Sequence, residues 1–325
     1  MPKKEIVTSK EDDVQSTTDD SVEAIAKNEG TLVLDATCAP ASIAYPHDLQ
    51  LLNDAREHLE EMIDHLHSQR GGKKPRTYRK KARKQYLNVS KSKKPTRKKM
   101  RQAIRQQLEH VNRDIKWVTQ YLNEGHDLSD QQLGLFDVIK RLYGQQKEMY
   151  DSKKHTIKDR IVSLYQPHIR PIVRGKVKAL TEFGAKVEIS VINGYVQIER
   201  LSWDAYNESE TLIPAAERYF EQNGVYPERI LADKIYRNRV NLAFCKEHGI
   251  RLSGPALGRP KKNQVVDKRA EYEDLCDRNI VEGKFGEGKN TYGLNRIVTK
   301  LKETSEAVIY GIMMTMNLTR RLREE

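Results

Sequence analysis

The chain has 325 residues, of which 37% are hydrophobic and 32% are charged, and its formal net charge is +12. This length suffices for one large domain or two ordinary ones with a buried core. No stretch approaches the roughly 18 apolar residues of a membrane span, and the polar N-terminus lacks the apolar segment of a signal peptide. We therefore predict a cytoplasmic protein with no membrane partner.

The positive charge is concentrated in one segment. Residues 70–105 contain 17 Lys or Arg and no Asp or Glu, and subtracting these cations from the net charge of +12 leaves −5 for the rest of the chain. A basic segment of this kind is typical of proteins that contact phosphate backbones, so it predicts a polyanionic partner. The alternative is a solvated, flexible loop, because blocks of like charge are often disordered.

The first half of the chain predicts one strand followed by helices. Residues 1–30 are polar and predict a flexible lead-in. Residues 31–38 form an apolar, partly β-branched run, which predicts a buried strand that carries Asp35 towards its C-terminal edge and ends at Pro40. Beyond it, apolar side chains recur at helical spacing, so we predict that residues 48–162 are mostly helical.

The second half predicts more strands. Residues 172–180, 185–191 and 195–201 have strand patterns, and Asn193-Gly194 is a type I′ hairpin signal, so we expect an antiparallel meander. The elements after it are a helix from Ser209 as its cap to Gln222, a strand over 229–233 that ends in Asp233, a helix over 237–248, a strand over 250–253 and a mostly helical remainder that ends with residues 294–323.

Arg278, Glu282 and Lys289 have Arg-x3-Glu-x6-Lys spacing, which places one carboxylate between two cations. On a helix Arg278 and Glu282 share a face, and Lys289 returns to it seven residues later. The three glycines within residues 283–288 favour a helix end before Lys289. The alternative is an exposed helix with an ordinary ion pair.

Asp35 and Asp233 are predicted near strand ends, and Glu282 on a helix. The carboxyl ends of neighbouring strands in an α/β sheet can converge, so we expect the three carboxylates to share one site. Such a set can hold two divalent cations about 3.5 to 4 Å apart for phosphoryl transfer. Mg²⁺ suits these oxygen ligands, and Mn²⁺ is an alternative.

These residues resemble a family, the insertion-sequence DDE transposases. Residues 34–40 (LDATCAP) are similar to the family's first-carboxylate strand, and residues 232–237 (ADKIYR) to its second. The loop at 254–260 is also similar. Glu282, with its two cations, matches the last three members of the Tyr-x2-Arg-x3-Glu-x6-Lys signature. Leu275 stands in the tyrosine's place, and Tyr272 lies about one turn earlier.

The resemblance implies an α/β fold: a ribonuclease-H-like mixed sheet flanked by helices, with a long, basic helical insertion after the first strand. The catalytic domain would cover residues 31–325, with the insertion at 48–162 and the rest of the core and a C-terminal helix at 170–325. The implied activity is metal-dependent cleavage at the ends of a mobile element, followed by 3′-hydroxyl strand transfer into target DNA.

The resemblance also implies roles and partners. Asp35, Asp233 and Glu282 would be catalytic and hold Mg²⁺, in a homo-oligomer assembled on element ends and target DNA, associated with the nucleoid. The expected DNA contacts are Arg278, Lys289, Lys73, Lys74, Arg76, Arg79, Lys80, Lys81, Arg83, Lys84, Lys98 and Lys99.

One departure concerns the N-terminus. Members of the family usually carry a helical, DNA-end-binding region before the first Asp, whereas only 34 residues precede Asp35. We therefore expect a truncated copy or one of two cooperating products. Two alternatives to a transposase are a non-catalytic DNA-binding remnant and a repair or resolvase-type nuclease that cleaves branched DNA with the same metal chemistry.

Overall fold

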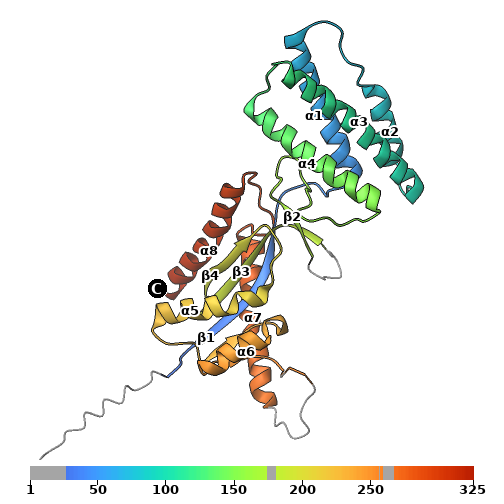
Figure 1. Cartoon of the computed structure of the whole chain (residues 1–325). Coiled ribbons are helices and arrows are strands. Elements are labelled where there is room, and N and C mark those ends of the chain that lie inside the picture. Colours follow the sequence, from blue (N-terminus) through green and yellow to red (C-terminus); the bar gives the residue numbers. More distant parts are fainter. Residues whose placement is uncertain (1–26, 174–180, 256, 259–266) are drawn as a thin grey trace, which may run out of the picture.

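The computed structural model describes residues 27–173, 181–255, 257–258 and 267–325. A mixed β-sheet carries helices on both faces, and four further helices, α1 to α4, form a bundle that leaves the sheet after its first strand (Figure 1). We call this bundle, residues 48–152, the helical module. The elements are β1 (Thr31–Pro40), α1 (Asp48–Arg70), α2 (Arg79–Ser90), α3 (Arg97–Asn123), α4 (Asp130–Ser152), β2 (Arg170–Val173), β3 (Thr181–Ile192), β4 (Tyr195–Ser202), the 3₁₀ turn η1 (Glu208–Glu210), α5 (Leu212–Asn223), β5 (Arg229–Leu231), the 3₁₀ turn η2 (Lys234–Tyr236), α6 (Arg239–Glu247), β6 (Arg251–Leu252), α7 (Lys268–Thr291) and α8 (Lys302–Glu324).

β1 is the central strand of the sheet. The strand order is β2-β3-β1-β5-β6, and β4 pairs with β3 outside this path. β1 runs antiparallel to β3, with Asp35 opposite Ile189, and parallel to β5, with Val33 opposite Leu231. The sequence prediction of a mixed α/β sheet flanked by helices is confirmed.

The side chains of β1 alternate between two hydrophobic cores. Leu32 and Leu34 pack with side chains of α5 and α6, whereas Val33 and Ala39 pack with side chains of α7 and α8. Successive side chains of a strand point to opposite faces. Asp35 is in phase with Val33, so it lies on the face of the sheet that α7 covers.

The helical module has a core of its own. Apolar side chains at helical spacing, such as Leu59 of α1, Val111 of α3 and Ile139 of α4, are fully buried in it. Ser129 begins α4 with a capping box, in which its side chain and that of Gln132 bond to each other's backbone. Helices thus cover most of residues 48–162, as the sequence predicts.

The strands differ from their predicted lengths. Asn193 and Gly194 have φ values of 51° and 80°, the left-handed conformation of a type I′ turn, and the predicted hairpin is present as β3–β4. β5 ends at Leu231, because Asp233 caps η2 with its side chain instead of continuing the strand. β1 continues to Pro40, so Asp35 lies in its middle and not towards its C-terminal edge.

Two helix starts were predicted wrongly. Ser209 does not cap α5: it lies within η1, and α5 begins at Leu212, after Thr211. The last helix begins at Lys302 and not at 294, because residues 294–301 form a connection whose Ile297 is bonded to the backbone of Pro40.

The predicted end of the helix before Lys289 was also wrong, since α7 continues to Thr291. Its buried face, which includes Val281 and Phe285, packs in the core between the sheet and α8, and this burial outweighs the low helix propensity of glycine. Gly288 lies in a close contact there: a Cβ atom would lie 3.2 Å from Cδ2 of Leu294, so that side chain would have to give way for a larger residue.

Three predictions fall partly outside the described residues: the lead-in up to residue 26, the strand over 172–180 beyond residue 173, and the loop over 254–260 at residues 256, 259 and 260. Within the described part of the chain, no helix is both long enough and apolar enough to span a bilayer.

Candidate functional site

The pairing of β1 with β5 places two of the predicted carboxylates at the same level of the sheet. Val33 lies opposite Leu231 in the parallel register, and Asp35 and Asp233 each follow two residues later. The chain leaves the sheet after β5, because Asp233 caps η2. Its side chain accepts a 2.6 Å hydrogen bond from the backbone N–H of Lys234. Asp233 is therefore exposed at the end of β5, next to the strand that carries Asp35.

Arg278 connects Asp233 to the third carboxylate. Its Nη1 lies 3.6 Å from Oδ1 of Asp233, and its Nη2 lies 3.9 Å from Oε1 of Glu282, one helical turn further along α7. Two of the three predicted carboxylates thus approach one guanidinium group from different elements. The side chains of Asp233 and Glu282 are 54% and 62% exposed, so both are accessible to a substrate.

Two contacts determine how α7 lies along β1. Near its start, Asp274 accepts a 3.1 Å hydrogen bond from Arg229, which lies opposite Thr31 in the sheet. Near its end, Nζ of Lys289 donates a 2.9 Å hydrogen bond to Oγ1 of Thr37. α7 therefore runs along β1 in the same direction, and Lys289 contacts the strand that carries the first aspartate.

This alignment gives the level of Glu282. Glu282 follows Asp274 by eight residues, or about 12 Å at roughly 1.5 Å per helical residue. Asp35 follows Thr31 by four residues, or about 13 Å at roughly 3.3 Å per strand residue. Glu282 and Asp35 therefore lie at about the same height on one face of the sheet, the face where Asp233 and Arg278 also meet.

The donor set suits a hard divalent cation, since it consists of carboxylate oxygens, of which those of Asp233 and Glu282 are accessible and only loosely paired with Arg278. Among the described residues, however, no three acidic, His or Cys side chains are close enough to form a set that could hold a metal ion. The predicted ligands thus fit in chemistry and in position along the sheet, while their side chains are not gathered in this conformation.

Glu188 of β3 belongs to the same region, and sequence reasoning missed it. It is fully buried on the opposite face of the sheet from Asp35, and its Oε1 accepts hydrogen bonds from the hydroxyls of Thr211 and Tyr236, the latter at 2.7 Å. Burial raises the pKa of Glu188 to about 7, although these hydrogen bonds act to lower it. Tyr236 ends η2, so Glu188 attaches the turn that begins at Asp233 to the sheet.

The sequence pattern around Glu188 predicts an exposed side chain and not a buried one. Glu188 alternates with Val187 and Ile189, a pattern that predicts a solvent-facing position on a half-buried strand. At Glu188 that face of β3 is instead covered by Thr211 and Tyr236, whose hydroxyls bond to the carboxyl group. Only the folded chain brings a buried carboxyl group and the hydroxyl of Tyr236 together.

Apart from Arg278 and Lys289, which lie on α7, the predicted DNA-contact residues divide into two groups. Arg79 donates a 2.7 Å hydrogen bond to Asp64 of α1, and Nζ of Lys74 lies 2.5 Å from the same carboxylate. Burial acts to raise the pKa of Asp64, but the hydrogen bonds from these two cations outweigh it and lower that pKa. Arg79 and Lys74 therefore attach the basic segment to α1.

The second group is exposed and, among the described residues, has no ion pair within 4 Å of its charged groups. These cations lie before and on α2 and in the first turn of α3. They are Lys73, Arg76, Lys80, Lys81, Arg83, Lys84, Lys98 and Lys99.

Leu275 and Tyr272, the two described residues considered for the place of the signature's tyrosine, both lie on α7. Leu275, which stands in its place, is 60% exposed, and Tyr272, the other candidate, is 69% exposed. Tyr272 lies in the first turns of α7, beside Thr31 and Arg229 and more than two helical turns from Glu282.

Comparison with known proteins adds one finding. Residues 230–319 match a family model described as a transposase DDE domain, a range that includes Asp233, Arg278, Glu282 and Lys289 and begins after β1 and the helical module. No curated protein and no solved structure matches the chain. Over residues 230–319 the resemblance to DDE transposases that the sequence predicts is thus confirmed, because this part of the chain is similar to a transposase DDE domain.

Proposed function

We propose that the protein is a DNA transposase that cleaves strands at the ends of a mobile element and transfers the freed 3′-hydroxyl into target DNA. The observation that carries this proposal is the meeting of Asp233 and Glu282 at Arg278, at the level of Asp35 in the neighbouring strand. The order of elements supports a ribonuclease-H-like core: a strand with Asp, antiparallel strands, a helix, a strand followed by Asp, and a helix with Glu. On this proposal the helical module is an insertion after the first strand.

Asp35, Asp233 and Glu282 would hold Mg²⁺, with Mn²⁺ as the alternative. The bound ions would supply Lewis-acid chemistry, making a water or 3′-hydroxyl more acidic and stabilising the departing oxygen. Arg278 lies between the two exposed carboxylates without holding either firmly, and its guanidinium group would be available to bind a DNA phosphate. Lys289 binds Thr37 and so positions the strand of Asp35 against α7.

The exposed cations of α2 and of the start of α3 would hold duplex DNA through its phosphates, with an affinity that falls as salt rises. Their exposure and their lack of ion pairs within the described residues support this role. Two DNA ends must be joined to one target in transposition, so we propose a homo-oligomer assembled on DNA, in the cytoplasm at the nucleoid.

The proposal is tested with labelled duplexes taken from the DNA on either side of this chain's coding sequence, with Mg²⁺ and with EDTA. We expect Mg²⁺-dependent nicking at an element end and joining of that end to a plasmid, both abolished by Glu282→Gln. Glu273→Gln is the matched control, because Glu273 lies on the same helix and pairs with Arg269 away from the site. Equal product from wild type and Glu282→Gln contradicts the assignment.

A second candidate is a DNA-binding protein without catalytic activity. It is favoured by the absence, among the described residues, of a gathered set of three potential metal ligands. Both candidates bind duplex with the same salt dependence, so the cleavage assay separates them. Salt-sensitive binding with no Mg²⁺-dependent product from any flanking duplex supports the second candidate.

A further inference from the structure

A hollow of about 860 Å³ lies at the end of the helical module where α3 begins and α4 ends. Its floor is formed largely by apolar side chains: Met100 and Ile104 of α3, and Met149 and Tyr150 of α4. This volume lies in the range of pockets that hold small organic ligands or parts of larger ones. None of the DNA contacts predicted from the sequence lies in it.

The rim of the hollow is cationic. Arg97, Arg101, Lys153 and Lys154 line it, all four are exposed, and none has an ion pair among the described residues. The acidic residue in the lining, Asp48, is already neutralised, because its Oδ1 accepts 2.7 Å hydrogen bonds from Arg160 and Gln146. The hollow therefore presents a net positive rim around an apolar floor.

The ring of Tyr150, on the apolar floor, contacts one of the cations of the rim. The guanidinium group of Arg101 lies over the ring of Tyr150, 4.0 Å from its centroid. The next turn of chain is also shaped around the hollow: Lys153 has φ 57°, a left-handed conformation that usually requires glycine at a helix end. A lysine in this position keeps a cation at the rim.

We propose that this hollow binds an unpaired DNA strand, with a base against the stacked pair of Arg101 and Tyr150 and the adjoining phosphates on Lys154 and its neighbouring cations. Duplex DNA offers its phosphates but keeps its base faces stacked inside the helix, so it leaves the apolar floor unused. An unpaired strand offers both groups, and proteins that bind such strands combine aromatic platforms with a cationic groove. The choice of DNA as the ligand rests on the proposed function.

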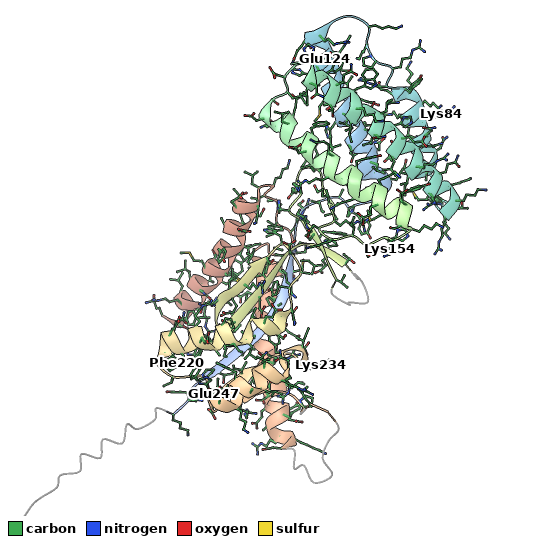
Figure 2. All side chains as sticks on the ribbon, in the orientation of Figure 1. Lys84, Glu124, Lys154, Phe220, Lys234 and Glu247 are labelled. Carbon is green, nitrogen blue, oxygen red and sulfur yellow. The ribbon has the colours of Figure 1, made fainter. Side chains whose placement is uncertain are left out.

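The position of the hollow fits a path along the molecule. In Figure 2, Lys84 of α2, Lys154 at the hollow and Lys234, which follows Asp233, lie along the same right-hand side of the view. In this view Lys154, at the hollow, lies between Lys84 and Lys234.

The experiment is fluorescence anisotropy of the full chain in EDTA, with labelled oligodeoxythymidine of about 15 nucleotides and a blunt duplex of equal length. Tyr150→Leu keeps apolar contacts and removes the ring, so we expect single-strand binding to weaken roughly fivefold to 100-fold and duplex binding to change less than about twofold. Lys154→Gln should lower the salt slope of single-strand binding by about 0.7, the value for one lost phosphate contact. The matched control is Lys116→Gln, an exposed α3 lysine outside the hollow, which should change neither.

Two outcomes overturn the proposal: single-strand affinity that is unchanged in both hollow variants, or equal losses for strand and duplex, which indicate a general polyanion surface. Far-UV circular dichroism checks that the Tyr150→Leu variant is folded. If that variant is unfolded, the binding measured with Lys154→Gln decides the question. Binding in EDTA does not depend on cleavage. If the protein binds the single strand in the hollow but never cleaves DNA, only the proposed function is contradicted. If it cleaves DNA and both variants bind the single strand normally, only the proposal for the hollow is contradicted.

Discussion

The guanidinium group of Arg278 lies 3.6 Å from Oδ1 of Asp233, so a residue in the middle of α7 reaches the end of β5. The distance exceeds that of a charge-assisted hydrogen bond, about 2.7 to 2.9 Å, and the contact to Glu282 is longer still, at 3.9 Å. More than half of each carboxylate side chain is exposed. Arg278 therefore attracts both groups but holds neither firmly.

This geometry predicts competition between Arg278 and a divalent cation. Arg278→Gln should bind Mn²⁺ more tightly in the absence of DNA, by no more than about thirtyfold, because each of its two exposed ion pairs contributes only about 0.2 to 1 kcal/mol. Isothermal titration calorimetry measures the affinity. Arg269→Gln removes an equal charge from the same helix, where Arg269 pairs with Glu273, and should leave the affinity unchanged. Weaker Mn²⁺ binding in Arg278→Gln would contradict the competition.

The glycines of α7 predict opposite effects on stability. Gly283→Ala should raise the free energy of unfolding by about 0.5 to 1 kcal/mol, since nothing lies within 4 Å of the new Cβ and alanine favours a helix. Gly288→Ala should lower it by about 1 to 2 kcal/mol, because its Cβ would lie 3.2 Å from Leu294 and 3.3 Å from Met316. Urea denaturation followed by circular dichroism measures the free energy of unfolding of both variants. Stabilisation by Gly288→Ala would contradict the prediction and show that the side chains of Leu294 and Met316 move aside at little cost.

Glu188 predicts a pH dependence of stability. Burial raises its pKa from 4.5 to about 7, so between these values the folded chain keeps a proton that the unfolded chain releases. The contribution is fully present below about pH 4.5 and is lost as the pH rises through about 7, a change of about 2 to 4 kcal/mol. Glu188→Gln keeps the shape without the proton equilibrium. Urea denaturation of both proteins between about pH 5 and 8 should show the fall in wild type and a flatter profile in the variant; parallel profiles would exclude Glu188 as its source.

Arg79 and Lys81, neighbours at the start of α2, should have different roles. Arg79→Gln removes the bonds to Asp64 and should lower the free energy of unfolding by about 1 kcal/mol, a modest value because both side chains are 38% exposed. Lys81→Gln should leave stability unchanged and reduce the salt slope of duplex binding by about 0.9, one phosphate contact. Thermal melts and anisotropy titrations test the pair, and an unchanged slope in Lys81→Gln would remove Lys81 from the interface.

The sequence predicted the parts of the site that depend on local pattern. The apolar run around Asp35 and the helical spacing of Arg278 and Glu282 are local signals, and the structure has the corresponding strand and helix. The contact of Lys289 with Thr37 could not be predicted, because it depends on how α7 lies along the sheet and on packing that carries the helix through three glycines.

Glu188 was missed for a related reason. Its strand pattern is that of an exposed residue, and its burial depends on elements that begin more than twenty residues later at Thr211. The division of the basic segment was equally hidden, since charge alone does not separate Arg79, which meets Asp64 of an earlier helix, from its exposed neighbours. Local pattern indicates which residues have suitable chemistry, and tertiary packing determines which of them are free to use it.

Asp48 has a consequence for the order in which the chain folds. β1 and β3 are adjacent in the sheet, yet residues 41–180 separate them, and closing an unstructured loop of that length costs about 4 kcal/mol. The bonds from Gln146 and Arg160 to Asp48 join the exit of the helical module to its entrance, so the folded module shortens the loop that must close. We therefore expect the bundle, whose contacts are mostly local, to form before the sheet, and the strand that carries Asp35 to find its partner late in folding.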